Sequence, residues 1–248
     1  LHYDTHSDVL RGTMDVENFD VGALLALGNQ KEDRVGGSIT SHIWVGGTRD
    51  NPSLGVTGEI AAGTVAGYPV TDASLDVSLS NHVLTIDRLT GKQGDGSFSA
   101  SGTVDFNGMM DVDATANDIA LGIFTGLAGI DEPVSGTASV TAHVGGTAQS
   151  PVADVSLSAK NGGVRGGTFD ALAGEIQVRG SVVRVNQLTV HKYIGGVDYT
   201  VSVHGTLPLH ALTADADEML SAAEQIDLTL SLDHADLSLL PVFSWEIE

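Results

Sequence analysis

Residues 97–106 read Ser-Phe-Ser-Ala-Ser-Gly-Thr-Val-Asp-Phe, and this stretch decides the fold. Its large or apolar side chains all occupy even-numbered positions: Phe98, Ala100, Val104 and Phe106. The odd-numbered positions hold only serine, threonine and aspartate. A period of two is typical of a β-strand with one buried and one wet face, because successive side chains point to opposite sides of a strand.

The same alternation runs through further segments, namely 138–144, 155–159, 199–203 and 226–232. Gly and Asn pairs such as Asn107-Gly108 and Gly195-Gly196 separate the segments, as hairpin turns with positive φ require. A helical composition is convincing only over 214–225, although short apolar stretches at 21–27 and 121–127 could each form a turn of helix. We therefore predict an all-β fold with a long, continuous, antiparallel-type sheet of about twelve to fourteen strands and one short inserted helix.

The chain also repeats itself. Gly37-Ser38 and Val45-Gly46-Gly47-Thr48 recur 99 positions later, as Gly136-Thr137 and Val144-Gly145-Gly146-Thr147 (37 to 136, 45 to 144). Gly102-Thr103 matches Gly205-Thr206 at an interval of 103 (102 to 205), which indicates that four residues are inserted between these words. Strand-like alternation resumes soon after Pro133, so a continuous sheet is a simpler interpretation than two domains joined by a linker.

The repeats divide the chain into three parts. We expect the end of a preceding repeat over 1–36, one complete repeat over 37–135, and a second repeat over 136–248 that carries a helical insertion near 211–225. Since Leu1 stands where a native start would have Met, we also expect the sequence to be a piece of a longer chain.

Charge and composition exclude several classes of function. With 32 acidic and 11 basic side chains the chain has a formal charge of −21, which argues against nucleic-acid binding because phosphate contacts depend on Lys and Arg. There is no cysteine, so disulfides, thiol nucleophiles and thiolate metal sites are excluded. Aromatic residues make up only 5% of the chain, a small supply for filling the space between two sheets.

Polar clusters give weak signals for chemistry. His2, Asp4, His6 and Asp8 share one face of a strand, but the alternating helices and further ligands of a metal-dependent barrel enzyme are missing. Asp111, Asp113 and Asp118 could be calcium ligands, although the spacing is not that of an EF-hand. His204 and His210 flank Pro208 without a catalytic partner at a suggestive spacing. We predict no enzyme, no catalytic residue, no metal and no cofactor.

The order of motifs resembles a known family. A Gly-rich strand, then Val-Gly-Gly-Thr-x-x-x-Pro, then alternating strands and an Asp-aliphatic phrase, as at Asp118-Ile119 and Asp236-Leu237, is similar to the repeat region of the AsmA-like superfamily, most closely the TamB-type translocation and assembly proteins. The resemblance covers nearly the whole chain from Gly37 onward and implies an internal fragment of a bridge-like lipid transport protein, with the sheet folded like a taco around a groove.

The resemblance also implies a setting. Such proteins lie in the periplasm of diderm bacteria, are anchored in the inner membrane by an N-terminal helix, conduct phospholipids, support outer-membrane biogenesis, and partner an Omp85-type outer-membrane barrel through their C-terminal segment. The partners implied for this fragment are phospholipid acyl chains and the rest of the same chain.

The apolar face of such a sheet also predicts a lipid groove. A sheet with one apolar face must cover it, and one short helix cannot cover a dozen strands, whereas an acyl chain supplies apolar volume where the inward residues are small. The predicted groove comprises the larger inward aliphatic and aromatic residues: Leu75, Val77, Leu79, Leu84, Ile86, Phe98, Val104, Phe106, Val140, Val144, Val155, Leu157, Ile176, Val178, Val183, Val185, Val201, Val203, Leu228 and Leu230.

Two other classes of function stay open at this point. Tandem immunoglobulin-like sandwiches of a cell-surface adhesin or stalk also repeat at about 100 residues and are often acidic. A β-rich enzyme such as a solenoid glycosidase would need paired carboxylates facing a cleft.

Overall fold

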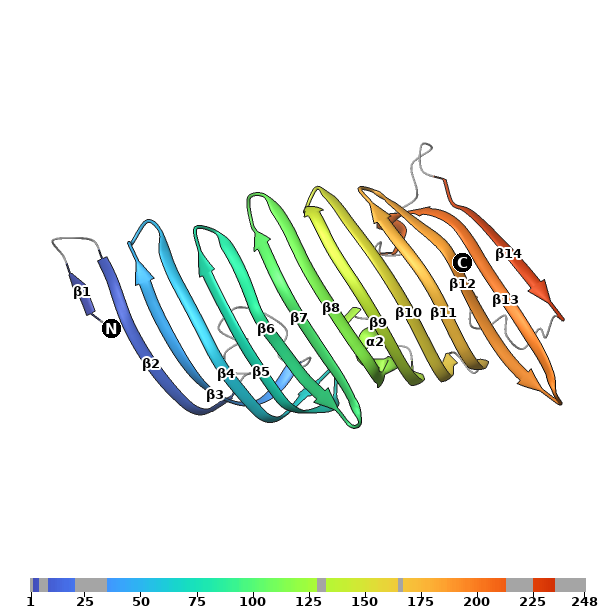
Figure 1. Cartoon of the computed structure of the whole chain (residues 1–248), viewed down its shortest axis with the longest axis horizontal. Helices are drawn as coiled ribbons and strands as arrows, with labels where there is room; N and C mark the ends of the chain where they lie inside the picture. The colour runs from blue at the N-terminus through green and yellow to red at the C-terminus, as the bar shows by residue number, and fades with distance from the viewer. Residues whose placement is uncertain are drawn as a thin grey trace.

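A computed structural model describes residues 2–4, 9–20, 35–128, 133–164, 167–212 and 225–234 of the chain. Fourteen strands form one sheet in strict chain order, and every neighbouring pair is antiparallel. The strands are β1 His2–Asp4, β2 Val9–Asp20, β3 Val35–Gly47, β4 Pro52–Val65, β5 Tyr68–Ser80, β6 Val83–Gln93, β7 Gly96–Asp105, β8 Met109–Ala120, β9 Val134–Thr147, β10 Ser150–Val164, β11 Gly167–Arg179, β12 Val182–Ile194, β13 Val197–Pro208 and β14 Asp227–Asp233. The predicted all-β, antiparallel sheet is confirmed (Figure 1).

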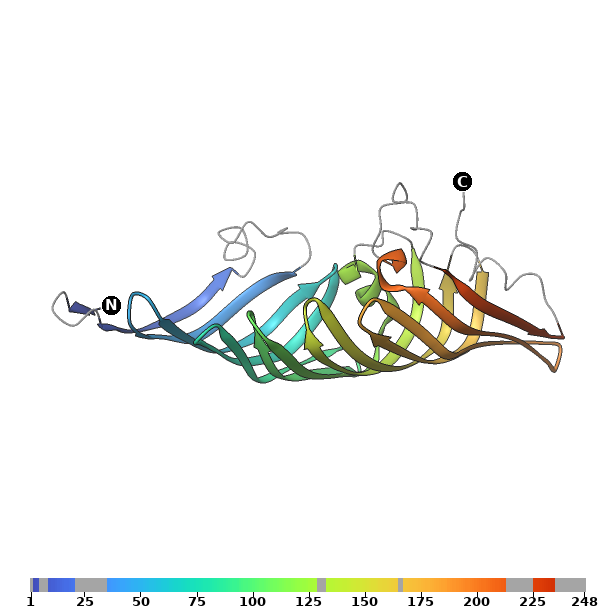
Figure 2. The same cartoon turned by 90° about the horizontal axis from the view of Figure 1, so that it is seen from above.

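The sheet is open and curved. Its strands bend into a trough, and the two ends of the strand order, β1 and β14, do not pair with each other (Figure 2). β8 pairs directly with β9, so the two predicted repeats belong to one continuous sheet, as expected. An architecture of tandem two-sheet sandwiches is therefore wrong for the described part of the chain.

Helical structure within the described residues is limited to α2 Leu121–Ala128 and a 3₁₀ turn, η2 Leu209–Leu212. α2 corresponds to one of the two short apolar stretches, and it packs on one face of the sheet. The predicted insertion near 211–225 and the stretch 21–27 lie almost wholly outside the described residues.

The internal repeat is visible in the backbone. Strands β3 to β8 correspond in order to β9 to β14, and bulges occur at matching positions, between Ile86 and Leu89 in one repeat and between Val185 and Leu188 in the other. Glycines of the repeated words also adopt matching conformations: Gly47 and Gly146 have φ of 83° and 81°, and Gly102 and Gly205 have φ of 139° and 141°. These values fall where only glycine is unstrained, which explains why the words recur.

Other bulges use a different residue type. Asn18, Asp118 and Asn161 have φ near +50° and lie where the register shifts between β2 and β3, β8 and β9, and β9 and β10. Asn and Asp tolerate this left-handed conformation better than other residues with a side chain. The bulges increase strand twist and bending, and so contribute to the curvature of the trough.

Candidate functional site

An apolar face runs across the sheet from β2 to β14. Residues that pair across strands lie on the same face, so the register can be followed from strand to strand. Leu54 pairs with Leu79, Leu79 with Leu84, and Leu84 with Val104. Farther along, Ile176 pairs with Val185 and Val203 with Leu230. We call this continuous surface the apolar face, and α2 packs on it.

The register brings together every residue of the predicted groove except Phe106. The members on the apolar face are Leu75, Val77, Leu79, Leu84, Ile86, Phe98, Val104, Val140, Val144, Val155, Leu157, Ile176, Val178, Val183, Val185, Val201, Val203, Leu228 and Leu230. Phe106 follows the end of β7, its backbone N–H donates to the carbonyl of His82 at 3.0 Å, and its side chain is 63% exposed. It belongs to a turn because β7 ends one residue earlier, at Asp105.

The apolar face also contains residues that the predicted groove does not include. Ile43, Val45 and Val56 belong to it through β3 and β4, and Val112 and Leu188 belong to it through β8 and β12. Their alternation was available in the sequence. Phe169 could not be found from the alternation, because it precedes the regular alternation of β11. It is nevertheless only 3% exposed and belongs to the buried cluster described next.

The apolar face has a covered section. Ala138, Ala159, Phe169, Val190 and Val201 form a cluster across β9 to β13, and Val190 and Val201 are 0% and 1% exposed. Leu121 and Phe124 of α2 pack against this cluster. Apolar protein atoms thus fill this part of the trough.

The apolar face also has an open section over β2 to β7, apart from Val65, Tyr68 and Phe98, which pack against the cluster of Ile123. Met14 is 55% exposed, Leu54 is 39% exposed and Leu89 is 36% exposed, although all three lie on the apolar face. At the opposite end Leu228, Leu230 and Leu232 of β14 are similarly exposed. Large apolar side chains in such a continuous row are unusual on a free surface and are typical of a binding groove.

The opposite face is polar and carries rows of paired side chains. Hydroxyl groups pair across strands, with Ser74 and Thr90 at 2.9 Å and Ser99 and Thr115 at 2.8 Å. Arg179 donates to the Asp154 carboxylate at 2.7 Å. Such pairs keep the polar face soluble and fix strand register.

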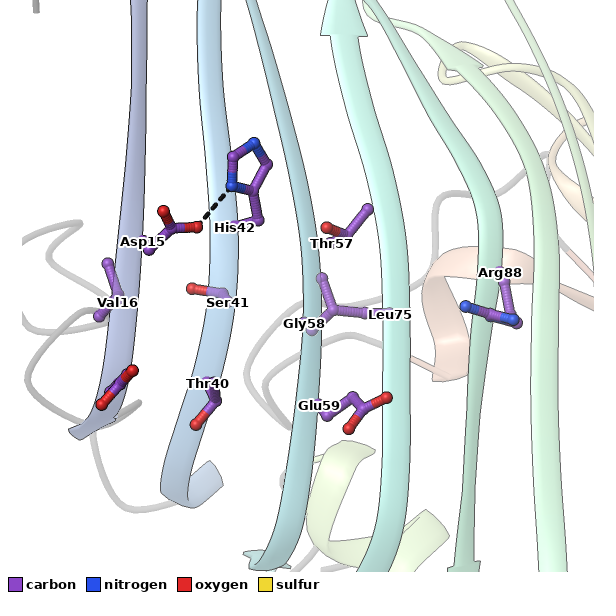
Figure 3. Close-up of a pocket in the computed structure, with 11 residues that line it drawn as sticks. Asp15, Val16, Thr40, Ser41, His42, Thr57, Gly58, Glu59, Leu75 and Arg88 are labelled. Carbon is purple, nitrogen blue, oxygen red and sulfur yellow. Dashed lines mark hydrogen bonds and ion pairs between the residues drawn. The ribbon is translucent and has the colours of Figure 1, made fainter.

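A pocket of about 380 Å³ lies between β2 and β6 and is lined mainly by polar-face residues, with Val16 and Leu75 also contributing (Figure 3). Its lining includes carboxylates of Asp15 and Glu59, the Arg88 guanidinium and the His42 ring, whose Nδ1 lies 2.6 Å from Asp15 Oδ1. Charges of both signs and hydroxyl groups dominate the lining, so this pocket does not suit an acyl chain.

Asp111, Asp113 and His143 form a second polar group on this face, and their ligand atoms lie within 4.8 Å of one another. His143 Nδ1 is 2.9 Å from Asp113 Oδ1 and 3.8 Å from Asp111 Oδ1. The hydrogen bond with Asp113, and then the charges of Asp113, Asp111 and Asp154, raise the pKa of His143. All three residues are exposed, and a cation could reach them only from open solvent.

The calcium grouping considered from the sequence is wrong in one member. Asp118 lies at a bulge and its carboxylate is 3.9 Å from Lys160 Nζ, so it does not join Asp111 and Asp113. Of the other candidates, His204 is exposed on β13 opposite Thr229, and His210 lies in η2. His6 and Asp8 lie outside the described residues, and no side chain is described for His2 and Asp4.

Within the described ranges, no helix is both long enough and apolar enough to cross a bilayer. Comparisons with family models, with curated proteins and with solved structures found no match to this chain.

Proposed function

We propose that this chain is a non-enzymatic lipid-binding segment whose apolar face holds phospholipid acyl chains along a trough. The observation that carries the proposal is the uninterrupted apolar face of a single open sheet, on which large aliphatic side chains such as Leu54 and Leu89 remain more than a third exposed. A sheet of this kind gains stability when its apolar face is covered, and hydrocarbon can supply the cover.

Energy and length both favour this ligand. Each buried CH₂ contributes about 0.8 kcal/mol, so a sheltered C16 tail contributes on the order of 10 kcal/mol without a polar clamp. Fourteen strands at about 4.8 Å spacing make a trough roughly 60 Å long. Several lipids could lie along such a length.

The resemblance to TamB-type proteins of the AsmA-like superfamily supplies the biological setting of the proposal. In that setting the segment belongs to an inner-membrane-anchored protein of the periplasm, conducts phospholipids between inner and outer membranes, and serves outer-membrane biogenesis. An Omp85-type barrel would be reached through other parts of the full-length protein.

Two neighbouring substitutions test the proposal. Val77 lies on the apolar face and Ser78 on the polar face of the same strand, and both are half-buried. The purified chain should carry phospholipid that organic solvent extracts and native mass spectrometry detects. V77D should reduce bound lipid severalfold, whereas S78D should leave it unchanged. A wild-type chain that carries no lipid and takes none from vesicles would contradict the proposal.

A further inference from the structure

α2 lies inside the trough that the proposed function assigns to lipid. Ile123 is 7% exposed and packs with Ala116 and Ile119 of β8, while Phe124 contacts both this cluster and the larger cluster of β9 to β13. The helix therefore occupies the surface that an acyl chain would need over these strands.

The far side of α2 is fitted to the turn between β4 and β5. Gly122 faces Tyr68, and any side chain at Gly122 would collide with the Tyr68 hydroxyl. A Cβ at Gly126 would lie 2.6 Å from the Cβ of Ala66. Glycines four residues apart share one face of a helix, so this smooth face lets α2 approach the turn closely.

α2 depends on these contacts for its stability. It has eight residues, two of them glycine, and no acidic side chain in its first turn or basic side chain in its last. Isolated helices of this length are unstable in water, and each interior glycine costs about 1 kcal/mol relative to alanine. Hydrocarbon that replaced α2 would cover the same apolar side chains of the sheet, so leaving the trough need not expose them to water.

We propose that α2 is a displaceable stopper in the lipid groove. While α2 is seated, acyl chains occupy the apolar face outside the helix, and they reach the cluster of β9 to β13 that α2 covers only when α2 leaves. This inference rests on the proposed function, because it assigns a regulatory element to the same groove.

Site-specific photocrosslinking tests the stopper. A benzophenone amino acid replaces Leu79 in the open section or Leu172 in the covered section, both half-buried on the apolar face. Each protein is irradiated with vesicles of phosphatidylethanolamine and phosphatidylglycerol that contain radiolabelled phospholipid. We expect labelling at position 79 to exceed labelling at position 172 by at least about tenfold.

F124A removes the side chain that joins α2 to both clusters, and it should raise labelling at position 172 to within about threefold of position 79. L127A also removes a large apolar side chain from the same helix, but one that is 47% exposed, so it should keep the wild-type ratio. Circular dichroism would check that both variants keep their strands.

A paired substitution gives a second test from the other side of α2. A Cβ at position 126 would lie 2.6 Å from the Cβ of Ala66, so G126A should push α2 away from the β4–β5 turn and raise labelling at position 172. Adding A66G removes the Cβ that position 126 meets, and the double variant should return labelling at position 172 to the wild-type level.

Equal labelling at both positions in the wild-type chain, or a ratio unaffected by F124A and by G126A, would overturn the stopper while leaving lipid binding intact. Absence of labelling at both positions in every variant would overturn the proposed function together with the stopper.

Discussion

The strands β3 to β8 and β9 to β14 solve one packing problem in two ways. In the first repeat Gly91 of β6 pairs with Phe98 of β7, and the Phe98 ring lies over the glycine. At the matching positions of the second repeat Val190 pairs with Val201, and both are fully buried. The pairs provide similar volume, and both lie beside α2: Phe98 packs against the cluster of Ile123, while Val190 and Val201 belong to the cluster that Phe124 contacts.

A second exchange runs the other way. Phe169 of β11 lies over Gly162 in the second repeat, whereas the first repeat has Val70 opposite Gly63 at the matching positions. One scaffold therefore accepts its aromatic side chain on different strands. The two repeats therefore share strand order and bulge positions, but they differ in which strand carries the large side chain at a given pair on the apolar face.

The largest effect should come from placing a charge in each section. V190D would bury a carboxylate without a partner and should lower the free energy of unfolding by about 3–5 kcal/mol. L89D lies on the same apolar face but is 36% exposed, and should cost about 1 kcal/mol. Urea unfolding followed by circular dichroism measures both, and equal losses would show that the two sections do not differ in cover.

A smaller effect should come from replacing the Gly91–Phe98 pair of the first repeat by the valine pair found in the second. G91V alone must displace the Phe98 ring, and F98V alone leaves a cavity over the glycine, so each should cost about 1–3 kcal/mol. The double variant recreates the valine pair of the second repeat and should recover to within about 1 kcal/mol of wild type. Additive losses in thermal melts of the four proteins would break the proposed equivalence.

The smallest effect concerns the polar face, where His143 occupies the position that Trp44 holds in the first repeat. Since the hydrogen bond with Asp113 raises the pKa of His143, the pair favours the folded state below the unfolded pKa of about 6.5, and that contribution is lost as pH rises through the higher folded pKa. NMR titration of the ring protons should give a midpoint above 6.5.

D113N should move that midpoint back toward the ordinary value, whereas D105N, at the end of β7, should leave it unchanged. Insensitivity of the midpoint to D113N would show that the hydrogen bond is not its main cause.

Much of the sheet could be predicted because alternation is a local property of the chain. The face on which Leu79 or Val203 lies follows from counting by two, and the repeated glycine words mark the bulges. Phe106 lies in the turn after β7, although alternation continues in the sequence past the end of the strand.

The division into open and covered sections could not be predicted in this way. It depends on where α2 rests, and α2 contacts Tyr68, which is far from it in sequence. The grouping of His143 with Asp111 and Asp113 likewise depends on the pairing of β8 with β9, two strands that α2 separates along the chain.

The four residues inserted before Gly205 show how the trough can change its dimensions. β12 has 13 residues against 11 in β6, and β13 has 12 against 10 in β7, so the hairpin gains two residues in each arm. Adding two residues to a strand keeps the same side chains on the apolar face, whereas adding one residue would move the following side chains to the polar face. Each described strand pairs only with its neighbours in sequence. Duplication of one hairpin would therefore lengthen the trough by roughly 10 Å and leave the other strand pairs unchanged. The length of the trough can evolve in steps of this size.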